Sequence, residues 1–315
     1  MKIVIPGGSG QVGAVVERAF TAAGHSVVVL SRNPRRPNEV PWDGRTLGAW
    51  AGELDGCDVV LNLAGRSVSC RYTPANLREM MDSRVLSARA VGEAIARAER
   101  PPQVWLQAST ATIYQHTFGA PNDEDGVIGG GESGVPAYWA YSVEIAKNWE
   151  RAQAEANTPH TRKVALRSAM VMSPARGGIF DYLAWMTRLG LGGPVAGGRQ
   201  YVSWIHDRDF VAALDFLTTH PDLTGPINLA APNPLPQRDF MRTLRHAWGT
   251  PIGLPATRTM AEIGAFALRS DTELLLKSRR VIPGRLPDAG FRFAYTDWDD
   301  AARDLVQRVR AGRDR

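Results

Sequence analysis

The chain has 315 residues, 44% of them hydrophobic and 22% charged, which is an ordinary composition for a globular protein of one large or two modest domains. The formal net charge is +5, and the basic residues are dispersed rather than gathered in runs, which argues against a nucleic-acid-binding protein. No segment approaches about 18 uncharged apolar residues, so we expect no membrane span and no membrane partner.

The opening residues 1–13, MKIVIPGGSGQVG, predict a nucleotide site. Residues 2–5 indicate a buried strand, Gly7, Gly10 and Gly13 follow at a spacing of three, and residues 14–22 continue as a helix. In this strand–turn–helix context the glycines permit a tight turn, close approach of a pyrophosphate and close helix packing. The positive helix end then faces the phosphates, although a merely structural turn remains the alternative.

Strand and helix patterns alternate through the first half of the chain. Short apolar runs predict further strands, and longer patterns rich in Ala, Arg and Glu predict helices between them. The predicted strands are 26–30, 58–63, 104–108 and 164–167, and the predicted helices are 77–100 and 141–156. Apolar strands separated by helices are typical of a parallel sheet covered on both faces, so we expect a doubly wound α/β fold with right-handed connections.

The second half is less regular. Glycines crowd residues 189–198, where they suit either a mobile flap or a plain surface loop. Residues 226–230 form a strand pattern that could return to the main sheet, and Asp207 and Asp209 are placed to cap the helix that follows them. We therefore expect a dinucleotide-binding domain over 1–170 and a smaller, interleaved C-terminal α+β lobe over 171–315.

The end of the second strand indicates which nucleotide is bound. An acidic residue there contacts the free ribose of NAD, whereas an arginine accommodates the 2′-phosphate of NADP. This chain has Ser31 and Arg32 at that point, and no Asp or Glu occurs before Glu39. A guanidinium and a hydroxyl suit a phosphate, so we predict NADP(H), with a solvated arginine-rich loop as the alternative.

Motifs along nearly the whole chain carry a family resemblance. They are GGSGQVG at 7–13, LSR at 30–32, DVVLNLAG at 58–65, ASTATIYQ at 108–115, LRSAMVMSPARGG at 166–178, RLGLGGPVAGGRQYVSWIHDRD at 188–209 and AGFRFAYTDW at 289–298. With these motifs the chain resembles the extended short-chain dehydrogenases/reductases (SDRs) of the nucleotide-sugar epimerase kind. Within them it is most similar to the branch of epimerase family proteins that carries a C-terminal domain of unknown function.

The resemblance implies a Rossmann sheet of the extended SDR type and a set of cofactor contacts. These contacts are Gly7, Ser9, Gly10, Gln11, Val12, Gly13, Ser31, Arg32, Leu63, Ala64, Gly65, Glu79, Arg84 and Val171. On residue chemistry alone, Glu79 and Arg84 would be solvated helix residues, and only the resemblance makes them cofactor contacts.

Catalysis in this superfamily uses a tyrosine, a lysine four residues later and a serine or threonine hydroxyl. Thr110 matches the hydroxyl position of the epimerase pattern, but the tyrosine–lysine pair is absent. Tyr141 and Lys147 are six residues apart, so on a helix of about 100° per residue they point about 120° away from each other. Tyr141 and Lys147 are kept as a catalytic prediction, although their spacing departs from the one that conventional hydride chemistry uses in this superfamily.

Other side chains could replace the missing pair. Tyr114 follows the threonine motif, where we expect a loop mouth, and is a further candidate proton donor. Tyr201, Trp204 and His206 lie in the branch-specific block and are candidate substrate contacts. His206 could act as an acid or base near neutral pH, although a histidine bonded within a structural turn is the plainer interpretation.

These observations favour an NADP(H)-binding oxidoreductase or epimerase that acts on a small, polar, nucleotide-sugar-like substrate. The alternative is a catalytically degenerate sensor or scaffold that holds NADPH without turnover. Cys57 and Cys70 have neither disulfide nor metal-ligand spacing, so we expect no metal site and a reducing, cytoplasmic environment. Because the first strand pattern begins at residue 2, we expect no leader peptide. Monomer and homodimer remain open.

Overall fold

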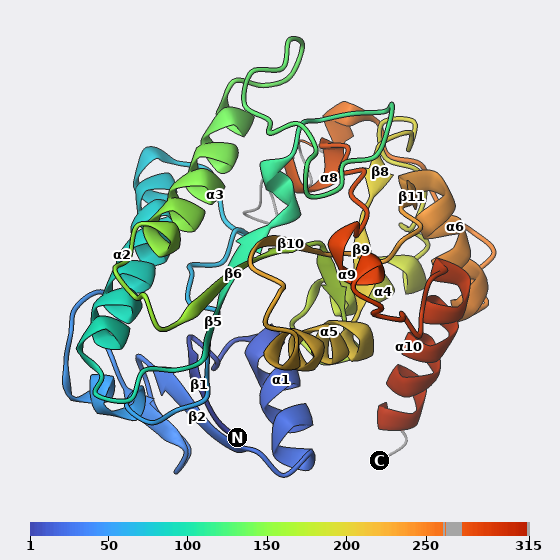
Figure 1. Ribbon diagram of the computed structural model, residues 1–315. Helices are drawn as coiled ribbons and strands as arrows, with labels where there is room; N and C mark the ends of the chain where they lie inside the picture. Colours follow the sequence, from blue (N-terminus) through green and yellow to red (C-terminus); the bar gives the residue numbers. More distant parts are fainter. Residues whose placement is uncertain (261, 263–272, 314–315) are drawn as a thin grey trace.

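A seven-stranded parallel sheet forms the centre of the computed structural model, which describes residues 1–260, 262 and 273–313 (Figure 1). The strand order is β10-β6-β5-β4-β1-β2-β3. The strands are β1 (Lys2–Pro6), β2 (Ser26–Ser31), β3 (Glu39–Pro41), β4 (Val59–Asn62), β5 (Val104–Thr110), β6 (Arg162–Ser168) and β10 (Gly225–Leu229). Every neighbouring pair runs parallel, so all carboxyl ends meet at one edge of the sheet.

Helices cover both faces of this sheet, as the sequence predicted. They are α1 (Gln11–Ala22), α2 (Pro74–Arg97), α3 (Tyr138–Ala154) and α5 (Asp207–Thr219). The buried side chains of α1 and α5 pack on one face, and those of α2 and α3 pack on the other (Figure 1). The doubly wound fold is therefore confirmed, and its core consists of the apolar strands that the sequence indicated.

Local signals set the ends of these elements. Helix α2 begins at Pro74, earlier than the predicted residue 77, because Thr73 accepts the backbone N–H of Asn76 and proline occupies the first helical position. Strand β3 was not predicted, since three residues on a sheet edge show no alternation. The pattern at 226–230 is confirmed as a returning strand, because β10 pairs in parallel with β6.

The C-terminal half adds a lobe with its own apolar core, in which Phe240 stacks on Trp298 with ring centroids 4.0 Å apart. We call this part the C-terminal lobe. Its strands are β7 (Met170–Met172), β8 (Tyr201–Val202), β9 (Trp204–His206) and β11 (Leu235–Pro236). Its helices are α4 (Ile179–Arg188), α6 (Gln237–Trp248), α8 (Glu273–Leu276), α9 (Arg285–Asp288) and α10 (Trp298–Arg313). Two short 3-10 helices, η1 (Ala49–Glu53) and η2 (Ala111–Ile113), complete the described elements.

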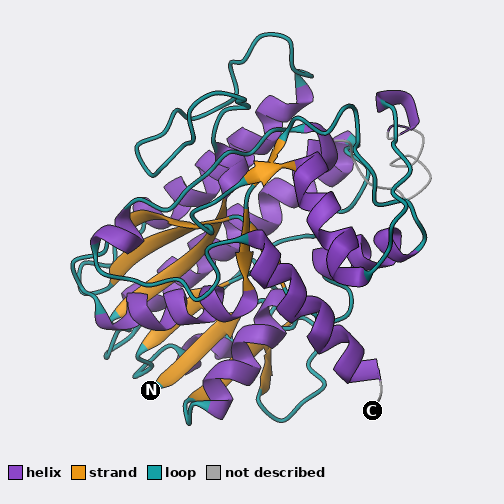
Figure 2. Ribbon diagram, turned by 90° about the vertical axis from the view of Figure 1, so that its right-hand side faces the viewer, coloured by secondary structure: helices purple, strands orange, loops and turns teal. Residues whose placement is uncertain are grey.

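The lobe and the sheet are interleaved along the chain. Both α5 and β10 follow residue 171 in sequence but belong to the layers of the main sheet. Figure 2 shows most of the strands on the left of the view, with the N-terminus, and the C-terminus on the right. The domain boundary at 170/171 stays a prediction.

The caps predicted for α5 were wrong. His206 is the N-cap, and its Nδ1 accepts the backbone N–H of Arg208 at 3.1 Å. Asp207 is instead paired with Arg308 at 2.8 Å, and Asp209 accepts the backbone N–H groups of residues 294 and 295. An imidazole nitrogen thus takes the role that the sequence suggested for a carboxylate.

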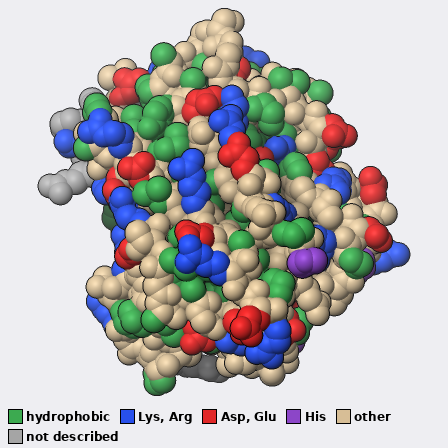
Figure 3. Space-filling model, turned by 60° about the vertical axis from the view of Figure 1, so that its left-hand side comes forward, with side chains coloured by type: hydrophobic (Ala, Val, Ile, Leu, Met, Phe, Trp, Pro, Cys, Tyr) green, Lys and Arg blue, Asp and Glu red, His purple; other side chains and the backbone are tan. Residues whose placement is uncertain are grey.

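Two further surface features bear on the predictions. The glycine-rich segment 189–198 is bonded to a second loop, because Leu254 donates to Gly190 O at 2.8 Å and Ala256 donates to Pro194 O at 2.9 Å. On the face shown in Figure 3, basic and acidic side chains are interspersed. Among the described helices, none is long and apolar enough to cross a bilayer.

Candidate cofactor and active site

A cavity of about 280 Å³ opens at the carboxyl ends of the parallel strands. This is the edge where open α/β sheets bind their ligands. Its lining residues are Val12, Leu63, Ala108, Ser109, Leu166, Ser168, Ala169, Val171 and Phe210. Three of the cofactor contacts that the resemblance implied, Val12, Leu63 and Val171, are thus brought together from segments far apart in the sequence.

At Gly7 and Gly13, the turn beside this cavity is packed too closely for a side chain. A Cβ on Gly7, whose φ is +75°, would lie 2.6 Å from the Cα of Ala64. A Cβ on Gly13 would lie 2.2 Å from the carbonyl oxygen of Gly8. Helix α1 starts after Gly10 with no side-chain cap and no acidic residue in its first turn. The positive end of α1 is therefore open to an anion.

Gln11 gives an independent indication that a polar group belongs here. Its side-chain amide nitrogen is buried and has no hydrogen-bond partner among the described residues. It lies against Gly178, the uncapped start of α4, where an added Cβ would lie 2.8 Å away. A buried donor without an acceptor is costly, and pyrophosphate oxygens would satisfy it. The turn, the open helix end and this amide together fit a dinucleotide.

The arginines of the loop that follows β2 differ in their ion pairing. Arg36 is taken up by ion pairs with Glu17 at 2.7 Å and Glu39 at 2.8 Å. The side chain of Arg32 is exposed and has no carboxylate within 4.0 Å in the part of the chain that the structure describes. Ser31 is buried at the strand end and accepts the backbone N–H of Asn33 at 3.3 Å. Arg35 is also exposed and has no ion pair among the described residues, so Arg32 and Arg35 both have guanidinium groups available to a ligand, and Arg32 lies nearer the strand end.

A buried asparagine holds the turn after β4. Asn62 Oδ1 accepts the backbone N–H of Ala64 at 3.0 Å, and Asn62 Nδ2 donates to Gln107 at 3.0 Å. These bonds keep Leu63 and Ala64 against the glycine turn. The sequence singled out Leu63, Ala64 and Gly65 but not the asparagine that positions them.

The two candidates on α2 differ in their surroundings. Arg84 packs against Gly65, where an added Cβ would lie 3.2 Å from its guanidinium carbon, and lies over the ring of Trp149 at 5.0 Å. Burial lowers the pKa of Arg84 to about 10. Glu79 is instead paired with Arg45 at 3.0 Å on the surface. Arg84 thus lies beside the predicted cofactor turn, whereas Glu79 already has a cationic partner.

Thr110 occupies the end of β5 and is half-buried. Its Oγ1 accepts the backbone N–H of Thr112 at 3.1 Å. This bond fixes the oxygen and leaves the hydroxyl proton to be donated elsewhere. The neighbouring Ser109 hydroxyl is already used, because it donates to Glu150 at 2.6 Å.

Tyr114 does not lie at a loop mouth, and this prediction was wrong. Only 1% of the residue is exposed, its hydroxyl donates to Asn228 Oδ1 at 2.8 Å, and it accepts from Arg167 at 2.9 Å. Arg167 in turn forms an ion pair with Glu150 at 2.9 Å. Burial raises the pKa of the Tyr114 phenol. The phenol is therefore part of a structural network beneath the site.

Trp204 and His206 were predicted as substrate contacts, and the structure contradicts both. Each is 0% exposed, so neither presents surface to a ligand. Trp204 packs in the core of the C-terminal lobe, with its ring 5.1 Å from that of Trp298. His206 Nε2 donates to Asp304 at 3.0 Å, and burial lowers the pKa of its imidazole. Tyr201 is half-buried, with the Arg280 guanidinium 4.3 Å from its ring centroid.

In the predicted catalytic pair on α3, the lysine is paired with a neighbouring glutamate. Lys147 forms an ion pair with Glu144 at 2.6 Å, and 39% of its side chain is exposed. Tyr141 is half-buried. On the buried side of the same helix, Ser142 donates to Glu273 at 2.5 Å, a contact with α8 that no local sequence signal indicated.

The strand order, the glycine turn and the strand-end cavity together define a dinucleotide-binding fold of the short-chain dehydrogenase/reductase class. The chain belongs to the NAD dependent epimerase/dehydratase family, which it matches over residues 3–230. Residues 265–305 match a domain of unknown function, DUF1731. The family resemblance predicted from the motifs is thereby confirmed.

Similar proteins span the same length. The epimerase family protein SDR39U1 of Bos taurus is 31% identical over 97% of this chain and 100% of its own. The epimerase family protein MT2273 of Mycobacterium tuberculosis is 31% identical over 95% of each chain. A crystal structure of human SDR39U1 (isoform 2) with NADPH superposes with a TM-score of 0.86, at 27% identity, over 98% of this chain and 99% of that one.

Proposed function

We propose that this protein is an NADP(H)-dependent oxidoreductase or epimerase that acts on a polar substrate bound above the strand-end cavity. The observation that carries the proposal is the open, uncapped end of α1 beneath a glycine turn in which Gly7 and Gly13 leave no room for a side chain. The NADPH held by the human relative supports the same assignment.

Different residues at the strand ends would bind different parts of the cofactor. Main-chain N–H groups of residues 9–13 and the side chain of Gln11 would bind the pyrophosphate. Ser31 and Arg32 would bind the 2′-phosphate, and Leu63 and Val171 would pack against the nicotinamide half. When bound, NADPH supplies a hydride to an electron-poor carbon of the substrate.

Thr110 would act on the oxygen of that carbon. Reduction of a carbonyl places the hydride on carbon and one proton on oxygen. The Thr110 hydroxyl is fixed by Thr112 and has its proton free to donate, so it would stabilise the charge that develops on the oxygen. Tyr141 remains a proposed proton donor, whereas Lys147 is paired with Glu144 and is given no role.

The test is NADPH consumption over a panel of carbonyl compounds. Removing one hydrogen-bond donor to a developing oxyanion costs a factor of about 10²–10³ in rate. Thr110→Val should show a loss of that size, and Thr110→Ser should retain most of the activity. Full activity in Thr110→Val would remove this hydroxyl from the mechanism, and unchanged activity in Tyr141→Phe would do the same for the phenol.

A sensor or scaffold that binds NADPH without turnover is the second candidate. The observation that favours it is the ion pair of Lys147 with Glu144, because Lys147 is the one lysine of α3 and no tyrosine lies four residues before it. This candidate predicts that NADPH binds and that no carbonyl compound of the panel consumes it. Measurable turnover with any member would exclude it.

A further inference from the structure

The segment that follows α8 bonds to the turn that carries the proposed catalytic hydroxyl. Lys277 Nζ donates to the carbonyl oxygen of Thr112 at 2.9 Å, and Arg279 Nε donates to Thr112 Oγ1 at 3.0 Å. Thr112 in turn donates its backbone N–H to Thr110 Oγ1 at 3.1 Å. Residues 165 and 167 positions later in the chain therefore hold both the main chain and the side chain of the residue that fixes Thr110.

Helix α8 itself is bonded to α3, the helix that carries the proposed proton donor. The hydroxyl of Ser142 donates to Glu273 Oε2 at 2.5 Å, and both residues are buried. Ser142 directly follows Tyr141 in the chain. This bond therefore sets how α3 is rotated about its axis at the position of the Tyr141 phenol.

One ion pair connects these two sets of contacts. The Lys277 ammonium lies 3.7 Å from the Glu273 carboxylate, and each side chain is 1% exposed. We call Glu273, Lys277 and Arg279 the clamp. Through the clamp, the turn of Thr110 and the helix of Tyr141 are bonded to the same short segment.

The charges of the clamp are costly to bury. Burial lowers the pKa of the Lys277 ammonium to about 8. Buried ion pairs contribute little to stability in comparison with apolar side chains of similar volume. Their advantage is directional, because charge-assisted hydrogen bonds are shorter and stronger than neutral ones. The clamp therefore suits a requirement for defined positions better than a requirement for stability.

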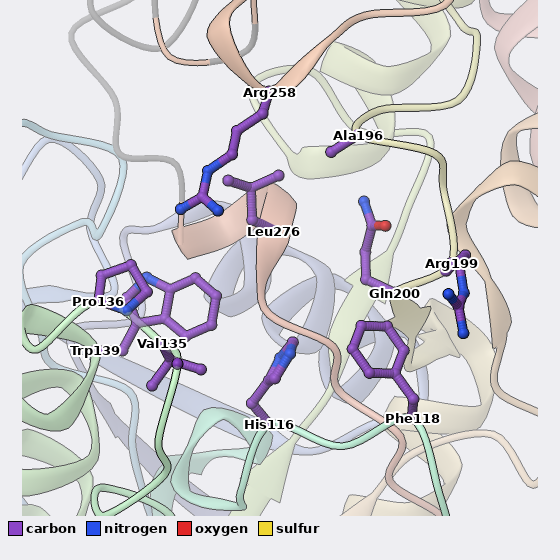
Figure 4. A pocket seen from close by; sticks show the side chains of 11 residues that line it. His116, Phe118, Val135, Pro136, Trp139, Ala196, Arg199, Gln200, Arg258 and Leu276 are labelled. Carbon is purple, nitrogen blue, oxygen red and sulfur yellow. The ribbon is translucent and has the colours of Figure 1, made fainter.

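The clamp also borders a second cavity, of about 320 Å³, between the chain that follows β5 and segments of the C-terminal half (Figure 4). Among the described residues this cavity shares no lining residue with the strand-end cavity. Leu276 of α8 faces His116 across it, and His116 Nδ1 accepts the backbone N–H of Ser278 at 2.8 Å. The wall of the second cavity and the turn of Thr110 are thus held by the same segment.

We propose that the clamp completes the active site: Glu273, Lys277 and Arg279 are positioning residues that hold the Thr110 hydroxyl and the Tyr141 phenol in a fixed relation to each other. All three fall within residues 265–305, which match a domain of unknown function, so the proposal gives that domain a role. The inference rests on the proposed function, which it deepens by naming residues that act through Thr110 and Tyr141.

Steady-state kinetics test the hold on Thr110. Thr112→Val keeps the shape of the side chain but removes the acceptor for Arg279, and Lys277→Met removes the donor to the Thr112 carbonyl. A misplacement of about 1 Å can cost about 10²-fold in rate, so each variant should lower kcat by about tenfold to 10²-fold and leave the KM for NADPH unchanged.

Two controls accompany these variants. Thr112→Ser keeps the hydroxyl acceptor and should recover most of the lost kcat. Arg292→Gln changes an exposed arginine of the same domain and should behave as the wild type. A kcat of Thr112→Ser as low as that of Thr112→Val would show that the hydroxyl bond to Arg279 is not what positions the turn.

Double-mutant cycles separate positioning from general support of the fold. Residues that act through one another give non-additive losses. Thr112→Val should therefore cost little further kcat in a Thr110→Val background, and Ser142→Ala should cost little further in a Tyr141→Phe background. Fully additive losses in both cycles would overturn the proposal.

Hydrogen exchange tests the clamp without turnover. The backbone N–H of Thr112 donates to Thr110 Oγ1, so it should exchange faster in Lys277→Met and Arg279→Gln than in the wild type. The amide of Leu166, buried in β6, serves as the internal control and should stay equally protected. Equal exchange at residue 112 in all three proteins would overturn the proposal.

The two proposals fail separately. If NADPH does not bind, or no carbonyl compound is turned over, the proposed function is wrong, and exchange at residue 112 still decides whether the clamp holds the turn. If Thr112→Val and Lys277→Met turn over substrate at the wild-type rate, the proposed function stands and the clamp is wrong.

Discussion

Gly13 is the residue at which the closest approach of main chain to main chain occurs beneath the cofactor site. Because an added Cβ would lie 2.2 Å from Gly8 O, Gly13→Ala should force the turn apart. Overpacking of this kind costs about 1–3 kcal/mol of unfolding free energy. Urea denaturation measures this loss of unfolding free energy. Gly52→Ala is the matched control, since an added Cβ at Gly52 meets nothing within 4 Å. Equal stability of both variants would show that the turn adapts.

Lys277 should make stability depend on pH. Burial lowers the pKa of its ammonium from 10.5 to about 8 in the folded state. Between these values the unfolded chain holds a proton that the folded chain lacks, so this contribution rises with pH by at most about 1.4 kcal/mol per unit. Below pH 8 both states are protonated, and the cost of burying the charge is fully present.

The measurement compares the unfolding free energy of the wild type and Lys277→Met from pH 7 to 10.5. The difference, wild type minus variant, should increase through this range, because only the wild type loses the buried charge. A difference that stays flat would show that Lys277 keeps its proton in the folded protein.

At the scale of single elements, the start of α5 shows what the sequence could not reveal. The segment YVSWIHDRD carries three candidate ligands by chemistry, but Trp204 and His206 are covered by α10, about a hundred residues later in the chain. Their burial depends on Trp298 and Asp304, which no local pattern connects to them. By contrast, the apolar strands and the glycine turn carry their signals within a few neighbouring residues, and they were predicted correctly.

The role of His206 can be tested at this element. His206→Ala removes the N-cap of α5 and the bond to Asp304 and leaves a cavity in a packed core. Caps are worth about 1 kcal/mol and buried hydrogen bonds about 1 kcal/mol more, so the unfolding free energy should fall by about 2–3 kcal/mol. NADPH affinity of the folded variant should be unchanged. A stable variant with impaired turnover would return His206 to the list of substrate contacts.

The network of hydrogen bonds and an ion pair beneath β5 and β6 is a second feature that the sequence could not reveal. Its members come from the chain after η2 and from α3, β6 and β10, and each would pass as an isolated polar residue in the sequence: Tyr114, Glu150, Arg167 and Asn228. The parallel register of β5, β6 and β10, together with the packing of α3, brings them together. The expected position of Tyr114 at a loop mouth failed because burial of a polar side chain depends on partners that are distant in the chain.

At the scale of the whole molecule, two cavities lie on either side of one turn, the segment of Thr110 and Thr112. The strand-end cavity lies where the parallel sheet and the glycine motif predicted a nucleotide site. The second cavity requires both halves of the chain, because its lining residues lie between 116 and 139 and at positions 196, 199, 200, 258 and 276. Interleaving of the C-terminal lobe with the sheet creates this arrangement, and the sequence indicated the interleaving but not the cavity.

If the end of α1, the glycine turn and Arg32 bind a phosphorylated dinucleotide, then NADPH and NADH should differ in affinity. Calorimetric titration with both nucleotides, on the wild type and on Arg32→Glu, measures this difference. The wild type should bind NADPH more tightly than NADH, and Arg32→Glu should lose most of this preference while NADH binding changes little. No heat with either nucleotide, or equal losses for both in Arg32→Glu, would contradict this mode of binding.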